Sequence, residues 1–409
     1  MKVIVLGAGG RGRVYTKYCR EYGVEIIAIA DPNVEKLHKL GSDFDVSEDN
    51  LFADWRDAME LADQADALIN ATPDRIHYET TMLALDKGLH VLLEKPMSPS
   101  EEECVTMVET AEEKGLILMV CHVLRYAPFF EKLKEVIESG RIGKLINIDL
   151  TENVVYWHFA HSFVRGVFRN EEQSSPFILQ KSCHDLDLIG YLTGKKCLSV
   201  VSEGGLTHFT EKNKPEGAPK YCLDGCPHEK TCPHFAPALY LKQFTNVTWP
   251  TASISVDNSY MGRYKALQDG PHGRCVYQCD NTVADHQSAI FNMEGGMTVD
   301  FNMIGFASEN TRTLRVFGTR GDIRGHLEKG ELEVTEFLDM KKEVIKADNT
   351  TIVSGHGGGD SRLLKDFIDA VNGDTADLRT TARLSLQSHL MAFAAEKSRK
   401  EGRRVYIES

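Results

Sequence analysis

The stretch that decides the fold is Lys2-Val3-Ile4-Val5-Leu6 followed by Gly7-Ala8-Gly9-Gly10-Arg11-Gly12. Its apolar run is typical of a buried parallel strand, and the residues that follow predict a helix over 11–21. The glycines fit the pattern G-x-G-x-x-G. In order, they permit a tight turn, close approach of a pyrophosphate to the backbone, and close packing of helix on strand. The motif therefore predicts that a diphosphate lies on backbone N–H groups at a helix N-terminus.

The next hundred residues alternate apolar runs with helical patterns. Strands are predicted over 25–30, 67–71, 89–93 and 116–121, and helices over 54–62, 76–87 and 101–114. Ser98, Pro99 and Glu101 are expected to start the last helix as N-cap, first helical residue and capping-box acid. Alternating strands and helices imply right-handed βαβ units, and hence a doubly wound parallel sheet in an α/β fold.

Asp31 ends the second predicted strand, 19 residues beyond Gly12. A carboxylate at this place accepts hydrogen bonds from both ribose hydroxyls and repels a 2′-phosphate. The sequence therefore predicts NAD as the cofactor, with NADP the less favoured choice. A glycine-rich turn without a ligand is the alternative.

Two further motifs follow neighbouring strands, at the edge where active sites of open α/β sheets lie. They are Ala71-Thr72-Pro73-Asp74-Arg75-Ile76-His77 and Glu94-Lys95-Pro96. Together with the glycine motif they resemble the Gfo/Idh/MocA family (glucose–fructose oxidoreductase, inositol dehydrogenase and rhizopine catabolism proteins), over essentially the whole chain. The resemblance implies a Rossmann domain that binds the cofactor and a cis peptide before Pro96. The cofactor-binding candidates outside the glycine motif and Asp31 are Ala71, Thr72, Pro73, His77, Glu94, Lys95, Pro96 and Arg125.

The second half of the chain reads as an antiparallel sheet with one polar face. After a helix over 128–139, residues 144–150 alternate, with Leu145, Asn147 and Asp149 on one face and Ile146, Ile148 and Leu150 on the other. Residues 288–293 and 297–303 pair through Glu294-Gly295-Gly296. Strands over 312–317 and 331–337 follow, then a helix over 361–372 capped by Asp360, and a final helix over 381–400.

These patterns divide the chain into a dinucleotide-binding Rossmann domain over 1–124 and a C-terminal α+β domain over 125–409. The second domain carries a polar, cysteine-containing insertion over about 203–250. The resemblance implies that its large, open, mostly antiparallel sheet binds substrate and meets a second subunit. A homo-oligomer through this sheet is therefore expected.

The chemistry is expected at Gln180-Lys181-Ser182-Cys183-His184-Asp185. Ser182 and Asp185 form a predicted capping box at a strand-to-helix junction, which places His184 in the first helical turn. The resemblance implies that His184 is the general base for a substrate hydroxyl, a role that suits the pKa of imidazole. The family pattern has an aspartate where this chain has Gln180, and Lys181 is an extra cation counted among the catalytic candidates. A helix-capping histidine is the alternative.

Lys95 is the other catalytic candidate, because its ammonium can stabilise charge that develops on the reacting oxygen. A structural ion pair with Glu94 or Asp74 is the alternative. Aromatic and basic residues cluster nearby in the sequence and suit the C–H faces and hydroxyls of a sugar. The substrate-binding candidates are Tyr126, Trp157, His161, Arg165, His184 and, in a glycine-rich loop, His356.

The insertion holds three cysteines within eleven residues, followed by a histidine. Cys222, Cys226, Cys232 and His234 are the candidate ligands of a structural zinc, which would order a loop too polar to fold by burial. His228, Cys275 or water are alternatives for the fourth ligand. A zinc that activates substrate and a redox-linked thiol cluster are alternatives for its role.

The composition bounds the remaining possibilities. The 409 residues carry a net charge of −13, with 42% hydrophobic and 26% charged residues, as in an ordinary folded protein. This charge argues against nucleic acid or an anionic membrane as partner. Ten cysteines without a signal peptide or an 18-residue apolar run favour a cytoplasmic protein with reduced thiols.

These observations predict an NAD-dependent oxidoreductase that transfers hydride between nicotinamide and a hydroxyl-bearing carbon of a sugar, polyol or glycoside. The first alternative is a redox-neutral glycosidase or isomerase that retains its NAD. The second is an NAD-binding sensor without catalytic activity.

Overall fold

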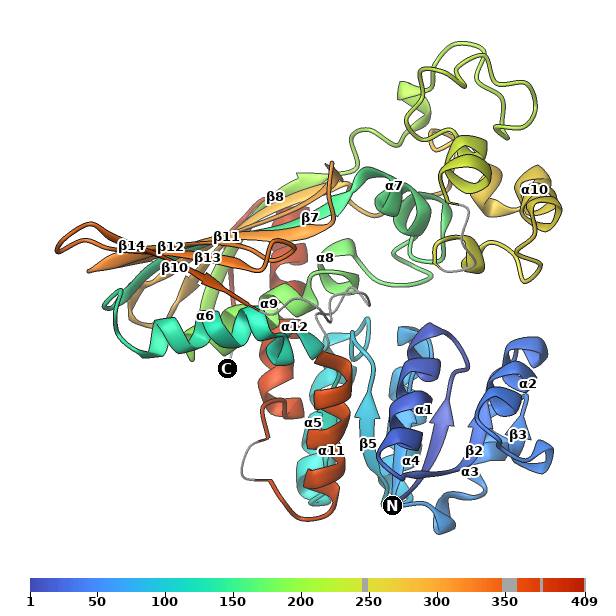
Figure 1. Ribbon diagram of the computed structural model, residues 1–409, viewed down its shortest axis with the longest axis horizontal. Helices are drawn as coiled ribbons and strands as arrows, with labels where there is room; N and C mark the ends of the chain where they lie inside the picture. The colour runs from blue at the N-terminus through green and yellow to red at the C-terminus, as the bar shows by residue number, and fades with distance from the viewer. Residues whose placement is uncertain (245–248, 348–358, 376–377, 408–409) are drawn as a thin grey trace.

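The computed structural model describes residues 1–244, 249–347, 359–375 and 378–407 (Figure 1). A first sheet of six parallel strands has the order β3-β2-β1-β4-β5-β6, which confirms the doubly wound α/β fold. Its elements are β1 Lys2–Leu6, α1 Gly10–Glu21, β2 Glu25–Ala30, α2 Val34–Asp43, β3 Leu51–Phe52, α3 Trp55–Met59, β4 Ala67–Asn70, α4 His77–Asp86, β5 His90–Leu93, α5 Glu101–Glu113 and β6 Leu118–Val120.

Two local predictions in this sheet need correction. Strand β3 is only two residues long, too short to leave a periodic pattern in the sequence, and was not predicted. Helix α5 has Ser100 as its N-cap, with the side chain accepting from the Glu103 amide, so the predicted start at Ser98 is two residues early. Ser98 instead contacts the Glu103 carboxylate and the Ser100 amide from outside the helix.

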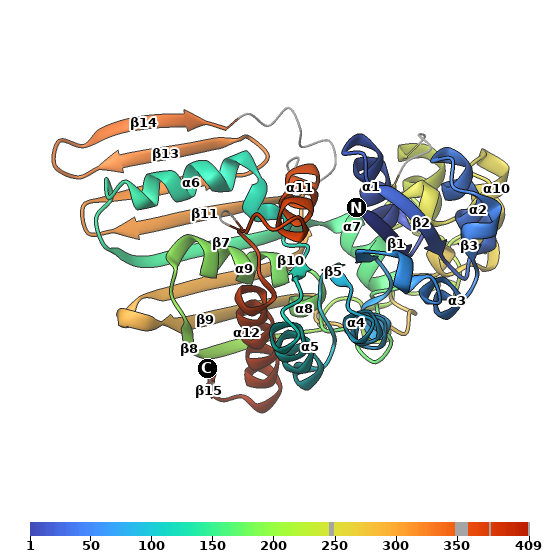
Figure 2. The ribbon, with the colours of Figure 1, turned by 90° about the horizontal axis from the view of Figure 1, so that it is seen from below.

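The second sheet has nine strands in the order β14-β13-β12-β11-β7-β10-β9-β8-β15, and only the β7–β10 pair is parallel among the pairs described. Helices α6, α9 and α12 cover one of its faces (Figure 2). Its strands are β7 Leu145–Val155, β8 Cys197–Gly205, β9 His286–Met293, β10 Thr298–Ala307, β11 Thr311–Gly318, β12 Gly321–His326, β13 Glu331–Glu336, β14 Lys341–Lys346 and β15 Val405–Tyr406. Its helices are α6 Pro128–Glu138, α7 Tyr156–Phe159, α8 Phe177–Gln180, α9 Cys183–Thr193, α10 Tyr260–Asp269, α11 Gly359–Val371 and α12 Ala382–Glu401.

The predicted faces of β7 are wrong at its start. The pairing of β7 with β11 shifts between Phe317 and Gly318, as in a bulge. As a result Leu145 is buried together with Ile148 and Leu150, whereas Ile146 is 48% exposed. An irregularity in strand pairing reverses the facing of every residue before it, and the alternation of the sequence alone does not reveal its position.

The insertion between neighbouring strands β8 and β9 is longer than predicted and occupies residues 206–285. It holds a hydrophobic cluster of its own, which includes Phe235, Leu239, Tyr240 and Leu267. The insertion therefore buries apolar surface, and the premise that it is too polar to fold by burial is wrong.

The last two helices return to the first sheet (Figure 2). Leu363, Leu364 and Phe367 of α11 pack into the core on one side of this sheet, and Ala382 and Leu386 of α12 into the core on the other. The two C-terminal helices thus cover opposite faces of the first sheet. No helix among the described residues has the length and apolar character needed to cross a membrane.

Candidate active site

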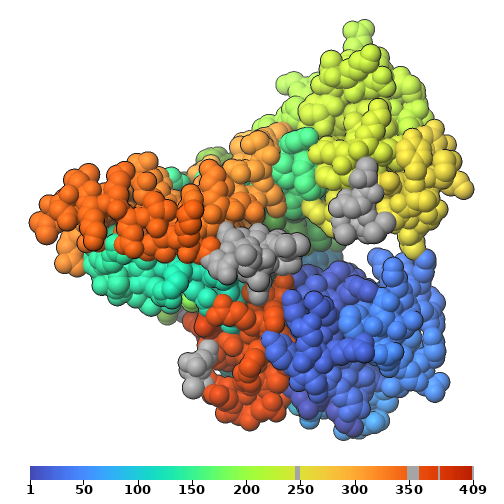
Figure 3. All heavy atoms as spheres, in the orientation of Figure 1, coloured from blue at the N-terminus to red at the C-terminus, as the bar shows by residue number. Residues whose placement is uncertain are grey.

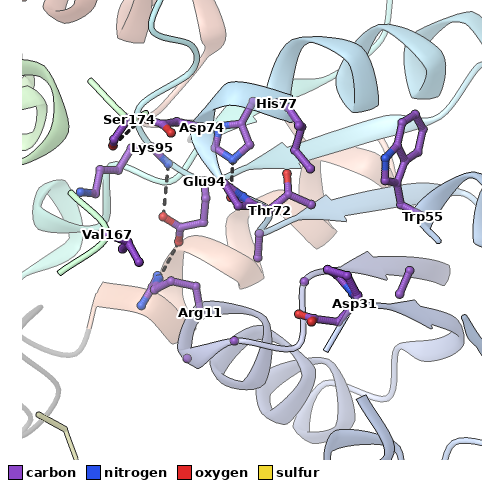
Figure 4. A pocket seen from close by; sticks show the side chains of 18 of the residues that line it. Arg11, Asp31, Trp55, Thr72, Asp74, His77, Glu94, Lys95, Val167 and Ser174 are labelled. Atoms are coloured by element: carbon purple, nitrogen blue, oxygen red, sulfur yellow. Dashed lines mark hydrogen bonds and ion pairs between the residues drawn. The ribbon is translucent and has the colours of Figure 1, made fainter. Parts of the chain in front are cut away.

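A cavity of about 740 Å³ opens at the carboxyl ends of the parallel strands (Figure 4). The glycine turn and Asp31 line it from the first sheet, and the segments before α8 and α9 line it from the second. Its other lining residues come mainly from the ends of β3, β4 and β5 and from residues 167–184. They include Trp55, Arg56, Thr72, Pro73, Asp74, His77, Glu94, Lys95, Phe168, Ser174, Gln180 and His184.

The glycine turn has the shape that a diphosphate requires. Gly9 is the N-cap of α1 without a side-chain cap, so the first backbone N–H groups of α1 have no capping side chain. Space around Gly9 and Gly10 is open, whereas a Cβ on Gly12 would lie 1.8 Å from the Gly7 oxygen. The predicted roles of close approach and close helix packing therefore fit this backbone.

Asp31 lies at the far end of the same cavity, beside Trp55 (Figure 4). Its carboxylate accepts from the Ala8 amide at 2.7 Å and from the Asn33 amide at 2.7 Å, which fixes it beside the glycine turn. Trp55 and Arg56 were not predicted at the site. They follow the two-residue strand β3, and recognising that strand would have placed them at the carboxyl edge.

Glu94 anchors the end of β5 to helix α1. It accepts from Arg11 Nε at 2.6 Å and from the Tyr15 hydroxyl at 2.6 Å, and Arg11 also pairs with Asp360 of α11 at 2.5 Å. Burial alone would raise the pKa of Glu94, but Arg11 and the Tyr15 hydroxyl outweigh it and hold that pKa below its ordinary value. Glu94 thus remains ionised and holds the segment that carries Lys95.

Lys95 follows β5 of the first sheet, and its Nζ donates to the backbone oxygen of Gln180, at the end of α8, at 2.8 Å. The Lys95–Pro96 peptide is cis, as the resemblance implied. His184 lies in the first turn of α9, is 5% exposed, and lines the same cavity as Lys95. Both principal catalytic candidates therefore line one cavity.

Gln180 is held by the carboxylate of Asp74, in the turn that follows β4. Its Nε2 donates to Asp74 at 3.1 Å and to the Ser174 hydroxyl at 3.0 Å, and Ser175 also donates to Asp74 at 2.7 Å. The amide at this position is therefore a donor to Asp74 and has no proton to exchange.

Lys181 is not among the residues that line the cavity. Its Nζ lies 3.4 Å from Glu152, which pairs with Arg312 at 2.6 Å, and Arg312 pairs with Asp185 at 2.8 Å. Burial lowers the pKa of Lys181, and Glu152 opposes that shift.

The predicted capping box is wrong, because Asp185 binds Arg312 and the Ser182 hydroxyl faces Met303 Sδ at 3.5 Å. A short helix, α8, and not a strand precedes α9.

Arg125 and Tyr126 lie outside the cavity lining. Arg125 is 4% exposed and donates two hydrogen bonds of 2.6 Å to the Asp187 carboxylate. Tyr126 is 1% exposed and contacts Thr380. Both side chains thus join α9 and the C-terminal helices to the residues after β6, and the structure gives neither a direct path to a ligand in the cavity.

Two further substrate candidates are committed to internal contacts. His161 bonds the Tyr240 hydroxyl at 2.8 Å and Ser253 at 3.0 Å, which occupies both ring nitrogens. Arg165 is fully buried and donates to the backbone oxygens of Arg274 and His234 at 2.7 Å each. Trp157 remains partly exposed on α7, and His356 lies outside the described residues.

The candidate zinc ligands do not form a metal site. No group of three or more His, Cys, Asp or Glu side chains within the described ranges is placed to hold a metal ion. Cys222, Cys226, Cys232 and His234 surround a small cavity beside Arg165, and all four belong to a region that has its own apolar core. The zinc site predicted from the sequence is therefore not shown by the described side chains.

Comparison with known proteins gives two family matches that together span nearly the whole chain. An oxidoreductase family with an NAD-binding Rossmann fold matches residues 1–122, and the C-terminal alpha/beta domain of the same family matches residues 134–407.

Individual relatives are distant. The putative oxidoreductase YteT of Bacillus subtilis is 24% identical over 76% of this chain and 74% of its own length. The D-glucoside 3-dehydrogenase of Escherichia coli is 28% identical over 49% of this chain and 56% of its own length. The chain thus spans only about half of several curated relatives that it matches. Among solved structures, levoglucosan dehydrogenase in complex with NADH and levoglucosan superposes with a TM-score of 0.73 at 17% identity and covers 100% of both chains, which supports the fold.

The buried position of Arg125 yields a prediction. Arg125→Met leaves the Asp187 carboxylate buried without its guanidinium, so we expect the protein to lose about 3–5 kcal/mol of stability. The dissociation constant of NAD for the folded variant should stay unchanged, because Arg125 does not line the cavity. Urea denaturation and titration calorimetry measure the two quantities. Wild-type stability combined with weakened NAD binding would contradict this prediction and indicate that Arg125 binds the cofactor.

Proposed function

This chain belongs to the Gfo/Idh/MocA oxidoreductase family, with an NAD-binding Rossmann domain, and from that premise we propose that it oxidises a hydroxyl-bearing carbon of a sugar, polyol or glycoside. One observation carries the proposal. A single cavity joins a glycine turn and Asp31 at one end to Lys95 and His184 at the other. Small-molecule sites combine an enclosed volume with a few polar groups that converge on it, as here.

The chain's own residues divide the work. The N–H groups at the start of α1 bind the diphosphate, and Asp31 accepts the ribose hydroxyls. NAD, when bound, supplies the carbon that takes up hydride. Lys95 donates to the reacting oxygen and stabilises the charge that grows on it. His184 takes the hydroxyl proton, because Gln180 is an amide already engaged with Asp74.

We assign Lys181 a supporting role in this site. Glu152, Arg312 and Asp185 hold it as part of a buried network on the second sheet. Its charge acts on Lys95 through space, since Lys181 does not line the cavity.

We also propose a cytoplasmic homo-oligomer. All ten cysteines are free thiols, as in proteins of reducing compartments. The face of the second sheet away from its helices exposes apolar side chains, among them Ile146, Ile290 and Val344. A second copy of the chain would remove them from water.

The role of Lys95 can be tested by Lys95→Met. We expect kcat with any accepted sugar to fall by roughly 10²–10³, the usual cost of removing a donor that stabilises an oxyanion. NAD affinity should change little. Lys87→Met, an exposed lysine of the same domain, is the matched control. Wild-type kcat in Lys95→Met would refute this role.

Cofactor choice provides a separate test. Asp31→Ser removes the carboxylate that repels a 2′-phosphate, so the ratio of kcat/KM for NAD to that for NADP should fall about tenfold or more. Tenfold corresponds to a free-energy difference of about 1.4 kcal/mol. Steady-state assays with both cofactors measure this ratio. An unchanged ratio would show that another group selects the cofactor.

A further inference from the structure

An aromatic cluster lies where α7 meets the insertion, outside the cavity lining. Trp157 of α7 lies with its ring centroid 4.7 Å from Phe244 and 5.3 Å from Trp249 of the insertion. His158 lies 4.7 Å from Trp249. Trp249 is 49% exposed, although the neighbouring phenylalanines Phe159, Phe163, Phe177 and Phe209 are buried. The cluster therefore presents an indole surface to solvent.

The exposed indole is held in place by two imidazoles. The rings of His158 and His161 meet Trp249 edge to face, at 76° and 89°. His161 is itself fixed by Tyr240 and Ser253, and the Ser253 hydroxyl also donates to the backbone oxygen of Pro250 at 2.6 Å. An aromatic ring that is fixed yet half exposed is prepared for contact with a ligand at little cost in side-chain entropy.

Ring contacts connect the cluster to the cavity lining. Phe168 lines the cavity with its ring centroid 5.8 Å from that of Phe163, and Phe163 lies 6.5 Å from His158. Burial, aided by the charges of Lys181, Arg312 and Lys95, lowers the pKa of His158 to about 3. His158 is therefore neutral and within electrostatic reach of both lysines, while its ring contacts Trp249. Figure 3 shows the insertion standing over the first domain with a hollow between them. A ligand that extends from the cavity past Phe168 would run toward the aromatic cluster.

Building on the proposed function, we propose that Trp249 and Trp157 bind the second ring of a glycoside whose first ring reacts between Lys95 and His184. The C–H face of a pyranose is apolar and its hydroxyls point outward, which suits a flat ring that is open to water on one side. Cofactor and reacting sugar share the cavity of about 740 Å³, so a second ring has to lie beyond it. A polyol or free monosaccharide would leave the indole uncovered.

The alternative is that Trp249 only closes the insertion against α7. In that case its loss would affect stability, or all substrates equally. Tyr260→Ala is the matched control, because Tyr260 is 55% exposed, lies in the same insertion and stacks only on Tyr264 among the ring contacts of the described residues.

The test uses the full chain with NAD and a panel of glucose, galactose, their methyl glycosides, cellobiose, maltose and lactose. For an accepted disaccharide, Trp249→Ala should lower kcat/KM by about 10- to 100-fold, as loss of an aromatic anchor does. Monosaccharides should lose less than about twofold, and Tyr260→Ala should behave as wild type. Equal losses for disaccharides and monosaccharides, or none, would overturn the subsite.

Calorimetric binding of the same sugars to the NAD-loaded protein separates this inference from the proposed function. A disaccharide that binds through Trp249 without NADH formation supports the subsite and contradicts net oxidation. Oxidation of monosaccharides without tighter binding of any disaccharide contradicts the subsite alone. Neither binding nor oxidation across the panel contradicts both.

Discussion

The hydrogen bond from Lys95 to the backbone oxygen of Gln180 is the contact on which the site depends. It joins the end of β5 to the junction of α8 and α9, at a distance of 2.8 Å. Because His184 lies in the first turn of α9, four residues after Gln180, the same contact helps to position His184 in the cavity that Lys95 also lines. On the other side, Glu94 fastens this segment to Arg11, and through Arg11 to Asp360 of α11. Groups from three distant parts of the chain are thereby fixed around one cavity.

The neighbouring carboxylate of Asp74 explains why an amide is suited to position 180. Asp74 already accepts from Ser175 and from Gln180, and an aspartate at 180 would place two carboxylates in contact in a buried site. One of them would then have to bind a proton. The amide of Gln180 donates a hydrogen bond to Asp74 and adds no second negative charge. It also leaves this position without a group that can accept a proton. Among the imidazoles that line the cavity, His77 is held between the carbonyl oxygens of Thr72 and Pro96, which leaves His184 for proton transfer.

Sequence reasoning succeeded where the pattern is local. Apolar runs and the glycine motif located the first sheet, and Glu94-Lys95-Pro96 located the lysine that donates to Gln180 of α8. It failed where the partner is distant. The sequence predicts Arg125 as a cation of the cofactor site, but the structure pairs it in a buried hydrogen bond with Asp187, 62 residues away. Trp55 follows a strand of two residues, and the cysteine segment has an apolar core that depends on residues as far along as Leu267. No short window of sequence contains these pairings.

The central claim is that this site removes hydride from a sugar carbon with net oxidation. The most direct measurement is the mass of the NADH formed from a sugar that carries deuterium at the carbon oxidised. The account predicts that released NADH carries the deuterium, in an amount equal to the sugar consumed. Consumption of the sugar with no NADH released, and with the deuterium retained in the product, would contradict it and indicate redox-neutral chemistry with a retained cofactor.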